Sequence, residues 1–596
     1  MTQASEGSLD RLWRAEKLMR QGNVDAARPL IDALEKEAAA LPSEAHLTWK
    51  LLKSHLLITT GDFEASHQLA EAVQQASLER GQPLQAVDAG IVMAEALEEL
   101  GKFAEDANAI AEGEQLLTTV TDEPPGALAQ RKASFIHLRG RNCLFKGEMD
   151  QALVYFQQSL TIRQELGTKH DIAVSLRNIG VMHGYKGDVE QALAYHQEAL
   201  KLFQEVGNKY RVAWCLTNIG GYHQEKGEFE HALEYAQQGL ALFQELGNKK
   251  MVAYSLGGVG GIYSAKGELT RALDYFQQQL AIAEELGSKR LLSDCLAAIG
   301  RLYLHRGDVD RALEYAQQYL AIGQELDNKL FIADAFFLIG INYWQKGALE
   351  QALAHLEESL RYYEEQGLSI SVGYCLFRLI FVSLDMGSPE RAQQFLNRLQ
   401  HINEHEDHKG LSQVSRVAQA LVLKASPRIR DKARAQELLQ QLIEEEMVHF
   451  LYTKLAMLNL CELLLDELKA YGEADVLQEA KSLVDTLYGL AQAQHSHSLA
   501  ANSLILQAKF AMIEGDLIAA AQYLEQARVT AEENSLGRLA EKVTAEKQDM
   551  EAQYDTWRDL IQRNASFEER LEQARLTDYV KAAKQVVSME PPDLSS

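Results

Sequence analysis

The sequence has few of the features that flexible linkers, disulfide frameworks and membrane spans require. It contains only nine prolines and five cysteines in 596 residues, and no long serine- or glycine-rich stretch divides it. No run of about 18 apolar residues is present to cross a membrane, and the polar start lacks the apolar core of a signal peptide. We therefore expect a cytoplasmic chain that is folded almost throughout and has no membrane partner.

Positive charge is also scarce. There are 59 lysines and arginines against 85 acidic residues, which gives a net charge of −26. Phosphate backbones attract lysine and arginine, so we expect no nucleic-acid partner. The acidic excess is typical of ordinary solvated helix faces, and the hydrophobic content of 46% suits a folded chain with an ample core.

Motifs for catalysis are missing. No phosphate-binding loop, dinucleotide fingerprint, nucleophile elbow or kinase signature occurs. His401 and His405 flank Glu404 with the spacing of a zinc-binding helix, and His408 follows one turn later. This segment ends a helix beside an acidic break and has no further ligand downstream. Cys215, Cys295 and Cys375 recur every 80 residues, too far apart in a repeat array to pair, and are predicted to be buried. We expect no enzyme activity, no metal and no cofactor.

An eight-residue segment is repeated six times. Its glycines fall at a period of 40 residues, which is typical of a solenoid whose units pack against their neighbours. The copies are Lys146–Leu153, Lys186–Leu193, Lys226–Leu233, Lys266–Leu273, Arg306–Leu313 and Lys346–Leu353.

Each repeat is predicted to form two antiparallel helices. In the unit 170–209, both halves carry apolar residues with helical spacing, and Gly187-Asp188 between them is a helix stop followed by an N-cap acid. A second turn closes each repeat, where a left-handed backbone is expected. The residues at that position are Gly167, Gly207, Gly247, Gly287 and Asp327.

These residues resemble the tetratricopeptide repeat in its 40-residue form, as in kinesin light chains and spindle-orientation scaffolds. One copy fills the consensus positions with Leu216, Ile219, Gly220, His223, Gly227, Ala232, Tyr235 and Gly239. The resemblance is strong from about Ala127 to Gly367. It implies an all-α fold, an α-α superhelix of antiparallel helix pairs.

The repeat weakens towards both ends, which predicts five parts. Residues 1–126 are expected to form degenerate helix pairs, 127–367 the regular array, and 368–535 further degenerate pairs. Residues 536–587 are expected to form a long helix or helices that cap the solenoid or associate with a second copy. The tail 588–596 is expected to be disordered.

The resemblance also implies which residues of each first helix face a concave groove. Arginine, asparagine and aromatic side chains there suit a peptide ligand. The predicted groove residues are Arg177, Asn178, Tyr185, Trp214, Asn218, Tyr254, Gly257, Gly258, Gly261, Arg301, Phe337 and Trp344. Gly257, Gly258 and Gly261 are glycines that the repeat consensus does not require. They either allow close helix packing or line a ligand pocket.

Three functions follow from these residues. The first is a non-enzymatic adaptor whose groove binds a peptide or helix of a partner protein. The second is a regulatory sensor of a small molecule or short peptide at the glycines. The third is a structural protein that forms a homo-oligomer through its C-terminal helices.

Overall fold

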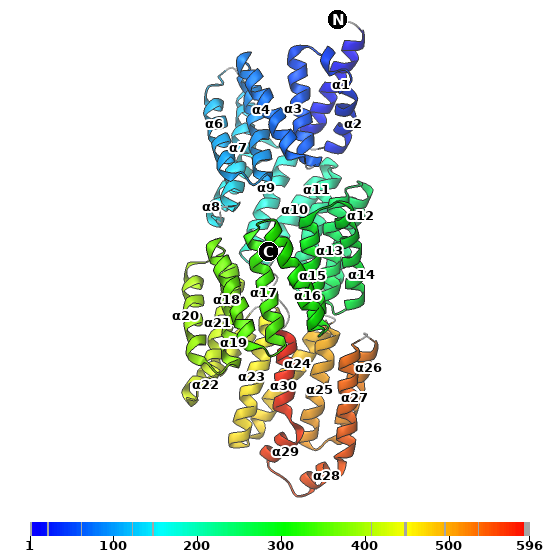
Figure 1. The fold of residues 1–596 in the computed structure, drawn as a ribbon, viewed down its shortest axis with the longest axis vertical. Helices are drawn as coiled ribbons and strands as arrows, with labels where there is room; N and C mark the ends of the chain where they lie inside the picture. The colour runs from blue at the N-terminus through cyan, green and yellow to red at the C-terminus, as the bar shows by residue number, and fades with distance from the viewer. Residues whose placement is uncertain are drawn as a thin grey trace. The chain divides into compact units, whose positions relative to one another are not determined.

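A computed structural model describes residues 3–20, 23–60, 62–121, 123–145, 148–406, 408–445, 450–493, 496–533 and 536–588. These residues form 30 α-helices and contain no strand, which confirms the all-α solenoid. The helices belong to two compact units, Met1–Ile219 and Gly220–Ser596 (Figure 1). No helix of the described residues is long and apolar enough to cross a membrane.

Unit 1 holds ten helices, one short 3-10 turn and most of an eleventh helix that it shares with unit 2. They are α1 (Gln3–Arg20), α2 (Val24–Leu34), η1 (Ala38–Ala40), α3 (Ser43–Thr60), α4 (Phe63–Glu79), α5 (Pro83–Glu99), α6 (Phe103–Thr118), α7 (Pro125–Phe145), α8 (Met149–Leu166), α9 (Lys169–Tyr185), α10 (Val189–Val206) and α11 (Lys209–Glu225).

Unit 2 begins within α11 and continues the same alternation. Its helices are α12 (Phe229–Glu245), α13 (Lys249–Ala265), α14 (Leu269–Glu285), α15 (Lys289–His305), α16 (Val309–Glu325), α17 (Lys329–Gln345), α18 (Leu349–Glu365), α19 (Ser369–Asp385), α20 (Pro389–His405), α21 (Lys409–Lys424), α22 (Ile429–Glu444), α23 (Phe450–Tyr471), α24 (Ala474–Ala493), α25 (His497–Glu514), α26 (Leu517–Glu533), α27 (Gly537–Ala552), α28 (Tyr554–Gln562), α29 (Phe567–Ala574) and α30 (Leu576–Ser588).

The turns form where the sequence predicts them. Gly207 ends α10 with φ 73° and Gly187 ends α9 with φ 72°, both in the left-handed region. Asp327 takes the same conformation with φ 49°, as expected for the copy that lacks glycine. Gly147, the first glycine of the series, lies outside the described residues.

Close helix packing depends on a small residue in each first helix. A Cβ atom at Gly180 would lie 2.8 Å from the ring of His196, and one at Gly260 would lie 2.7 Å from Phe276. Both neighbours are buried members of the following helix. The missing side chain therefore admits a bulky one, which builds the apolar layer between the two helices of a repeat.

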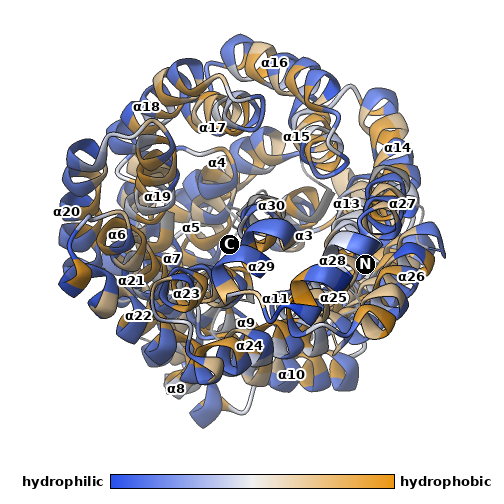
Figure 2. Ribbon diagram, turned by 90° about the horizontal axis from the view of Figure 1, so that it is seen from below, coloured by the Kyte–Doolittle hydropathy of each residue, from blue (hydrophilic) through white to orange (hydrophobic). Residues whose placement is uncertain are grey.

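The odd-numbered helices form the inner face of each unit. In unit 2, α13, α15, α17, α19, α21 and α23 each contact the next one in the series, as α1, α3, α5 and α7 do in unit 1. Figure 2 shows α14, α16, α18 and α20 outside their odd-numbered partners, and α8 and α10 outside α9. Side chains on the inner face of the odd-numbered helices are therefore the ones that can line a groove.

The C-terminal segment turns back onto this inner face. Helices α29 and α30 contact α23 and α25, and Figure 1 shows α30 running beside them. Four of its residues are almost fully buried, namely Leu576, Val580, Ala583 and Val587. The last helices thus cover the end of the solenoid. The segment 536–587 forms four helices, and the first break falls at Gln553, where ψ is 12°. The later breaks lie beside Asn564 and Arg575, whose φ angles are 53° and 49°.

The boundary between the two units falls within the predicted array 127–367, between Ile219 and Gly220. Residues 589–596, which include most of the predicted disordered tail, lie outside the described residues. The five-part division of the chain stays a prediction.

Candidate binding surface on the inner helices

A largely buried polar cluster lies where α7, α8 and α9 of unit 1 meet. His137 comes from α7, Arg163 from α8, and Ser175, Arg177 and Asn178 from α9. Arg163 Nη1 donates to Ser175 Oγ at 2.8 Å and to the carbonyl oxygen of Asp171 at 3.1 Å. Arg177 Nη2 donates to Asn178 Oδ1 at 2.7 Å, and Asn178 Nδ2 lies 3.0 Å from His137 Nε2.

This cluster has more hydrogen-bond donors than acceptors. Burial and the surrounding arginines hold the pKa of His137 well below its usual value, so the ring is neutral and offers one donor and one acceptor. Nδ1 of His137 faces Arg163 at 3.4 Å, while Nε2 faces the Asn178 amide. Arg163, His137, Asn178 and Arg177 form a row of contacts with a guanidinium donor at each end. For either tautomer of the ring and either orientation of the amide, one contact in this row therefore joins two donors.

Arg177 has the least satisfied charge of the group. Its Nε atom is buried without a hydrogen-bond partner, and its side chain is half-buried. Burial, and next the charge of Arg211 on α11, lower the pKa of Arg177. The nearby Arg141 differs, because Glu98 at 2.5 Å and Glu99 at 3.2 Å pair with it. An acceptor that reached Arg177 would relieve this imbalance.

The other predicted groove residues of unit 1 are half-buried. Tyr185 ends α9 against an apolar cluster that contains Phe156, and burial raises the pKa of its hydroxyl. Trp214 and Asn218 lie on α11, where each keeps part of its surface exposed. Asn178 is only 7% exposed. It therefore orients Arg177 instead of presenting its amide freely.

Unit 2 carries an acidic group on its inner face. Asp334 of α17 accepts hydrogen bonds from Tyr363 at 2.5 Å and from Tyr319 at 3.3 Å. Burial, together with the charge of Asp334, raises the pKa of Asp294 on α15 to about 6, although Arg290 and Arg301 act in the opposite direction. The predicted groove residue Arg301 thus lies close enough to both carboxylates to affect their ionisation.

The predicted aromatic residues of unit 2 differ in accessibility. Tyr254 is half-buried, and burial raises the pKa of its hydroxyl. Trp344 donates from Nε1 to Asp385 Oδ2 at 2.6 Å and packs against Phe381. Phe337 is only 1% exposed and belongs to the core. It does not reach the groove, because α17 is apolar on nearly all sides and is buried accordingly.

The glycine cluster of α13 divides into two kinds. A Cβ at Gly257 would lie 2.7 Å from the buried Gln279 side chain, so this glycine serves close packing. Gly258 and Gly261 have no atom within 4 Å of a Cβ position and face open space. Close packing therefore applies to Gly257, whereas a ligand pocket at Gly258 and Gly261 stays a prediction.

The three histidines His401, His405 and His408 do not form one cluster in the structure. His401, Glu404 and His405 are exposed and close together, but α20 ends at His405. His408 instead caps α21, where Nδ1 accepts from the backbone N–H of Leu411 at 2.9 Å. A second group of metal-ligating side chains, which sequence reasoning missed, consists of His223, Glu228 and His231. Comparing the same positions across the repeats could have revealed it.

Known sequences agree with the repeat assignment. The sequence model of the tetratricopeptide repeat family matches residues 133–204, 171–245 and 251–325. These segments are tetratricopeptide repeats, as predicted. No curated protein sequence matches the chain significantly.

Several solved structures are similar over part of the chain. A Rap protein complexed with Competence and Sporulation Factor is 18% identical and has a TM-score of 0.48, with 62% of this chain and 99% of that chain covered. The apo quorum sensor NprR from B. thuringiensis is 15% identical with a TM-score of 0.46, covering 61% and 99%. BtubC from P. vanneervenii is 20% identical with a TM-score of 0.31, covering 38% and 91%. At these values the similarity supports no functional conclusion.

Proposed function

We propose that this chain is a non-enzymatic binding protein that holds a peptide or a helix of a partner protein against the inner helices of its solenoid. The observation that carries the proposal is the donor-rich cluster around Arg177, where a buried Nε atom lacks a partner. Leaving such a group unsatisfied costs about 1–3 kcal/mol. A ligand oxygen that accepted a hydrogen bond from this guanidinium would recover part of that energy.

The charged residues of each unit favour different groups in a ligand bound to that unit. Arg177 and Arg211 in unit 1 favour a carboxylate or a backbone carbonyl. Asp294 and Asp334 in unit 2 favour a cationic or donor group instead. The chain as a whole is strongly acidic. The basic cluster is a local exception, so an acidic ligand would prefer it to the rest of the surface.

A peptide-display selection with the full-length protein tests this function. We expect peptides that contain aspartate, glutamate or a free C-terminal carboxylate to be enriched. Arg177→Met should weaken the selected peptides by about tenfold or more, since a tenfold loss corresponds to about 1.4 kcal/mol. Arg361→Met is the matched control, because Arg361 lies on the outer helix α18 and pairs with Glu358 and Glu365.

Selected peptides that bind both variants as tightly as the parent would contradict the proposal. The alternative of a small-molecule or short-peptide sensor is favoured by the open surface at Gly258 and Gly261. It predicts that Gly258→Leu, and not Arg177→Met, abolishes binding. Self-association through the C-terminal helices is less favoured, because their apolar residues are already buried within unit 2.

A further inference from the structure

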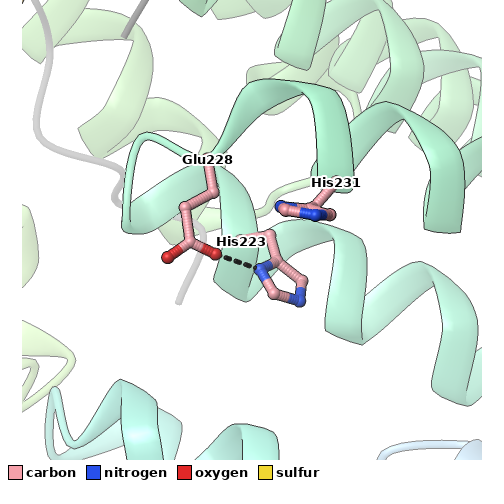
Figure 3. A group of neighbouring side chains, drawn as sticks. All are labelled: His223, Glu228 and His231. Atoms are coloured by element: carbon pink, nitrogen blue, oxygen red, sulfur yellow. Dashed lines mark hydrogen bonds and ion pairs between the residues drawn. The ribbon is translucent and has the colours of Figure 1, made fainter. Parts of the chain in front are cut away.

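Three metal-ligating side chains meet at the turn between α11 and α12. His223 lies in the last turn of α11, Glu228 caps α12, and His231 follows in its first turn. His223 Nδ1 lies 2.6 Å from Glu228 Oε2, and one ligand atom from each of the three residues lies within 4.8 Å of the others (Figure 3). We propose that this turn binds a single divalent transition-metal ion through His223, Glu228 and His231.

The backbone places the three side chains without strain. Gly227 takes φ 74°, and the Glu228 N–H donates to the His223 carbonyl oxygen at 2.8 Å. This tight turn brings residues 223 and 228 to the same side, while residues 228 and 231 share a helix face. The ring of His223 stacks on Tyr235 with centroids 5.3 Å apart and planes 3° from parallel. One ligand is therefore held in place before an ion arrives.

The equivalent turns of the neighbouring repeats show what is special about this one. The same aromatic stack occurs in each, as His183 with Tyr195, Tyr263 with Tyr275, Tyr303 with Tyr315 and Tyr343 with His355. The position of His231 is occupied there by Gln191, Arg271, Arg311 and Gln351. Only the turn at Gly227 combines two histidines with a carboxylate among these five described turns.

In two of these turns an arginine fills the place that an ion would take. Arg271 lies 2.7 Å from Glu268 and over the ring of Tyr263, and Arg311 lies 3.6 Å from Asp308 and over the ring of Tyr303. The carboxylate at the helix start thus pairs with a cation from three residues further on. In the repeat of Glu228 that cation is replaced by the imidazole of His231, a side chain that can ligate a metal ion.

The ligand set selects the class of ion. Two imidazoles and one carboxylate suit Zn²⁺, Co²⁺, Ni²⁺ or Cu²⁺, whereas Mg²⁺ and Ca²⁺ prefer oxygen ligands. Zinc lies about 2.0–2.2 Å from such ligands, so the ion would take the place of the hydrogen bond between His223 and Glu228, and the exposed His231 would move inwards. Lys226 Nζ lies 3.5 Å from the other oxygen of Glu228. Glu228 Oε2, which faces His223, is therefore the oxygen that would bind the ion.

The test is a titration of the full-length protein with Co²⁺ and Zn²⁺. His401→Gln and His405→Gln are introduced first, because the exposed pair on α20 is a rival chelator. In this parent we expect one equivalent of Co²⁺ to give a visible spectrum that Zn²⁺ displaces. His231→Gln, which restores the residue of two neighbouring repeats, should weaken binding by about tenfold or more, as should His223→Tyr. Circular dichroism checks that the variants fold.

A gain-of-site variant provides the opposite control. Gln191→His completes the same triad beside His183 and Asp188, whose side chains lie 3.8 Å apart, and should add a second equivalent. If His231→Gln binds cobalt with unchanged affinity, or if the parent binds none, the proposed site is wrong. Neither outcome depends on the peptide ligand.

Discussion

Lys584, in the last helix, lies 2.8 Å from Glu462 Oε2 in α23, although 122 residues separate them in the sequence. Lys424 of α21 pairs with the same carboxylate. Burial opposes ionisation of Glu462, but the two lysines lower its pKa to about 2. Burial and the charge of Lys584 lower the pKa of Lys424 to about 8. The last helix is therefore held against α23 and α25 by charge as well as by apolar contacts.

Removing the apolar contact of α30 should loosen the end of the solenoid. Leu576 is fully buried, so Leu576→Ala should lower the free energy of unfolding by about 2–5 kcal/mol. Hydrogen exchange should show the loss in α30, α23 and α25, because destabilisation in a solenoid stays local. Lys584→Met should cost less, since Glu462 keeps Lys424. Unchanged protection of α23 in the Leu576 variant would contradict the capping role.

The two kinds of glycine in α13 predict opposite stability changes. Gly258→Ala should stabilise the chain by about 0.5–1 kcal/mol, because the new methyl meets nothing within 4 Å and alanine favours the helix. Gly257→Ala should be neutral or destabilising, since the methyl would displace the buried Gln279. Thermal unfolding of the two single variants measures the difference. Equal gains in both would show that Gln279 moves freely.

The asparagines of the predicted groove form a second matched pair. Asn178→Ala should cost about 1–3 kcal/mol, because it leaves Arg177 Nη2 and His137 without their amide partner. Asn218 occupies the equivalent position of the next repeat but is half-exposed, so Asn218→Ala should change stability by no more than about 0.5 kcal/mol. Urea unfolding followed by circular dichroism measures both. A larger loss in the Asn218 variant would contradict the role assigned to the cluster.

The sequence predicts the repeats well because their signals are local. The turn glycines and Asp327 mark helix ends through backbone conformation alone, and their φ angles agree. The positions of Gly180 and Gly260 likewise identify where two helices approach. A period of 40 residues then extends each local prediction to the neighbouring units.

The site is less predictable, because position in a repeat gives the direction of a side chain and not its depth. Asn178 is one of the predicted groove residues, yet His137 lies against it from 41 residues earlier and leaves it 7% exposed. The same rule predicts Phe337 on the groove, but the apolar sequence of α17 around it buries the ring. His223 fills a repeat position in the sequence, and only the folded turn at Gly227 shows that it lies close to Glu228 and His231.

The inner face of unit 2 should make stability depend on pH through Asp294. Burial raises the pKa of this carboxyl to about 6, whereas aspartate in an unfolded chain titrates near 3.9. The folded chain therefore binds more protons between these values, so this group's contribution to stability is present below about pH 4 and is lost as pH rises through 6. The groups that act on it are Arg290, Arg301 and Asp334.

Asp294→Asn should remove that loss. We expect it to raise the free energy of unfolding by about 1–2 kcal/mol at pH 7, after allowance for solvent screening, and to change little at pH 4. Asp274→Asn is the matched control, because Asp274 is exposed on the outer helix α14. Thermal unfolding at both pH values measures the four cases. If Asp294→Asn raises the free energy of unfolding equally at pH 4 and pH 7, the lost charge at Asp294 is not the cause. If Asp274→Asn also raises it, the cause is the net charge of −26.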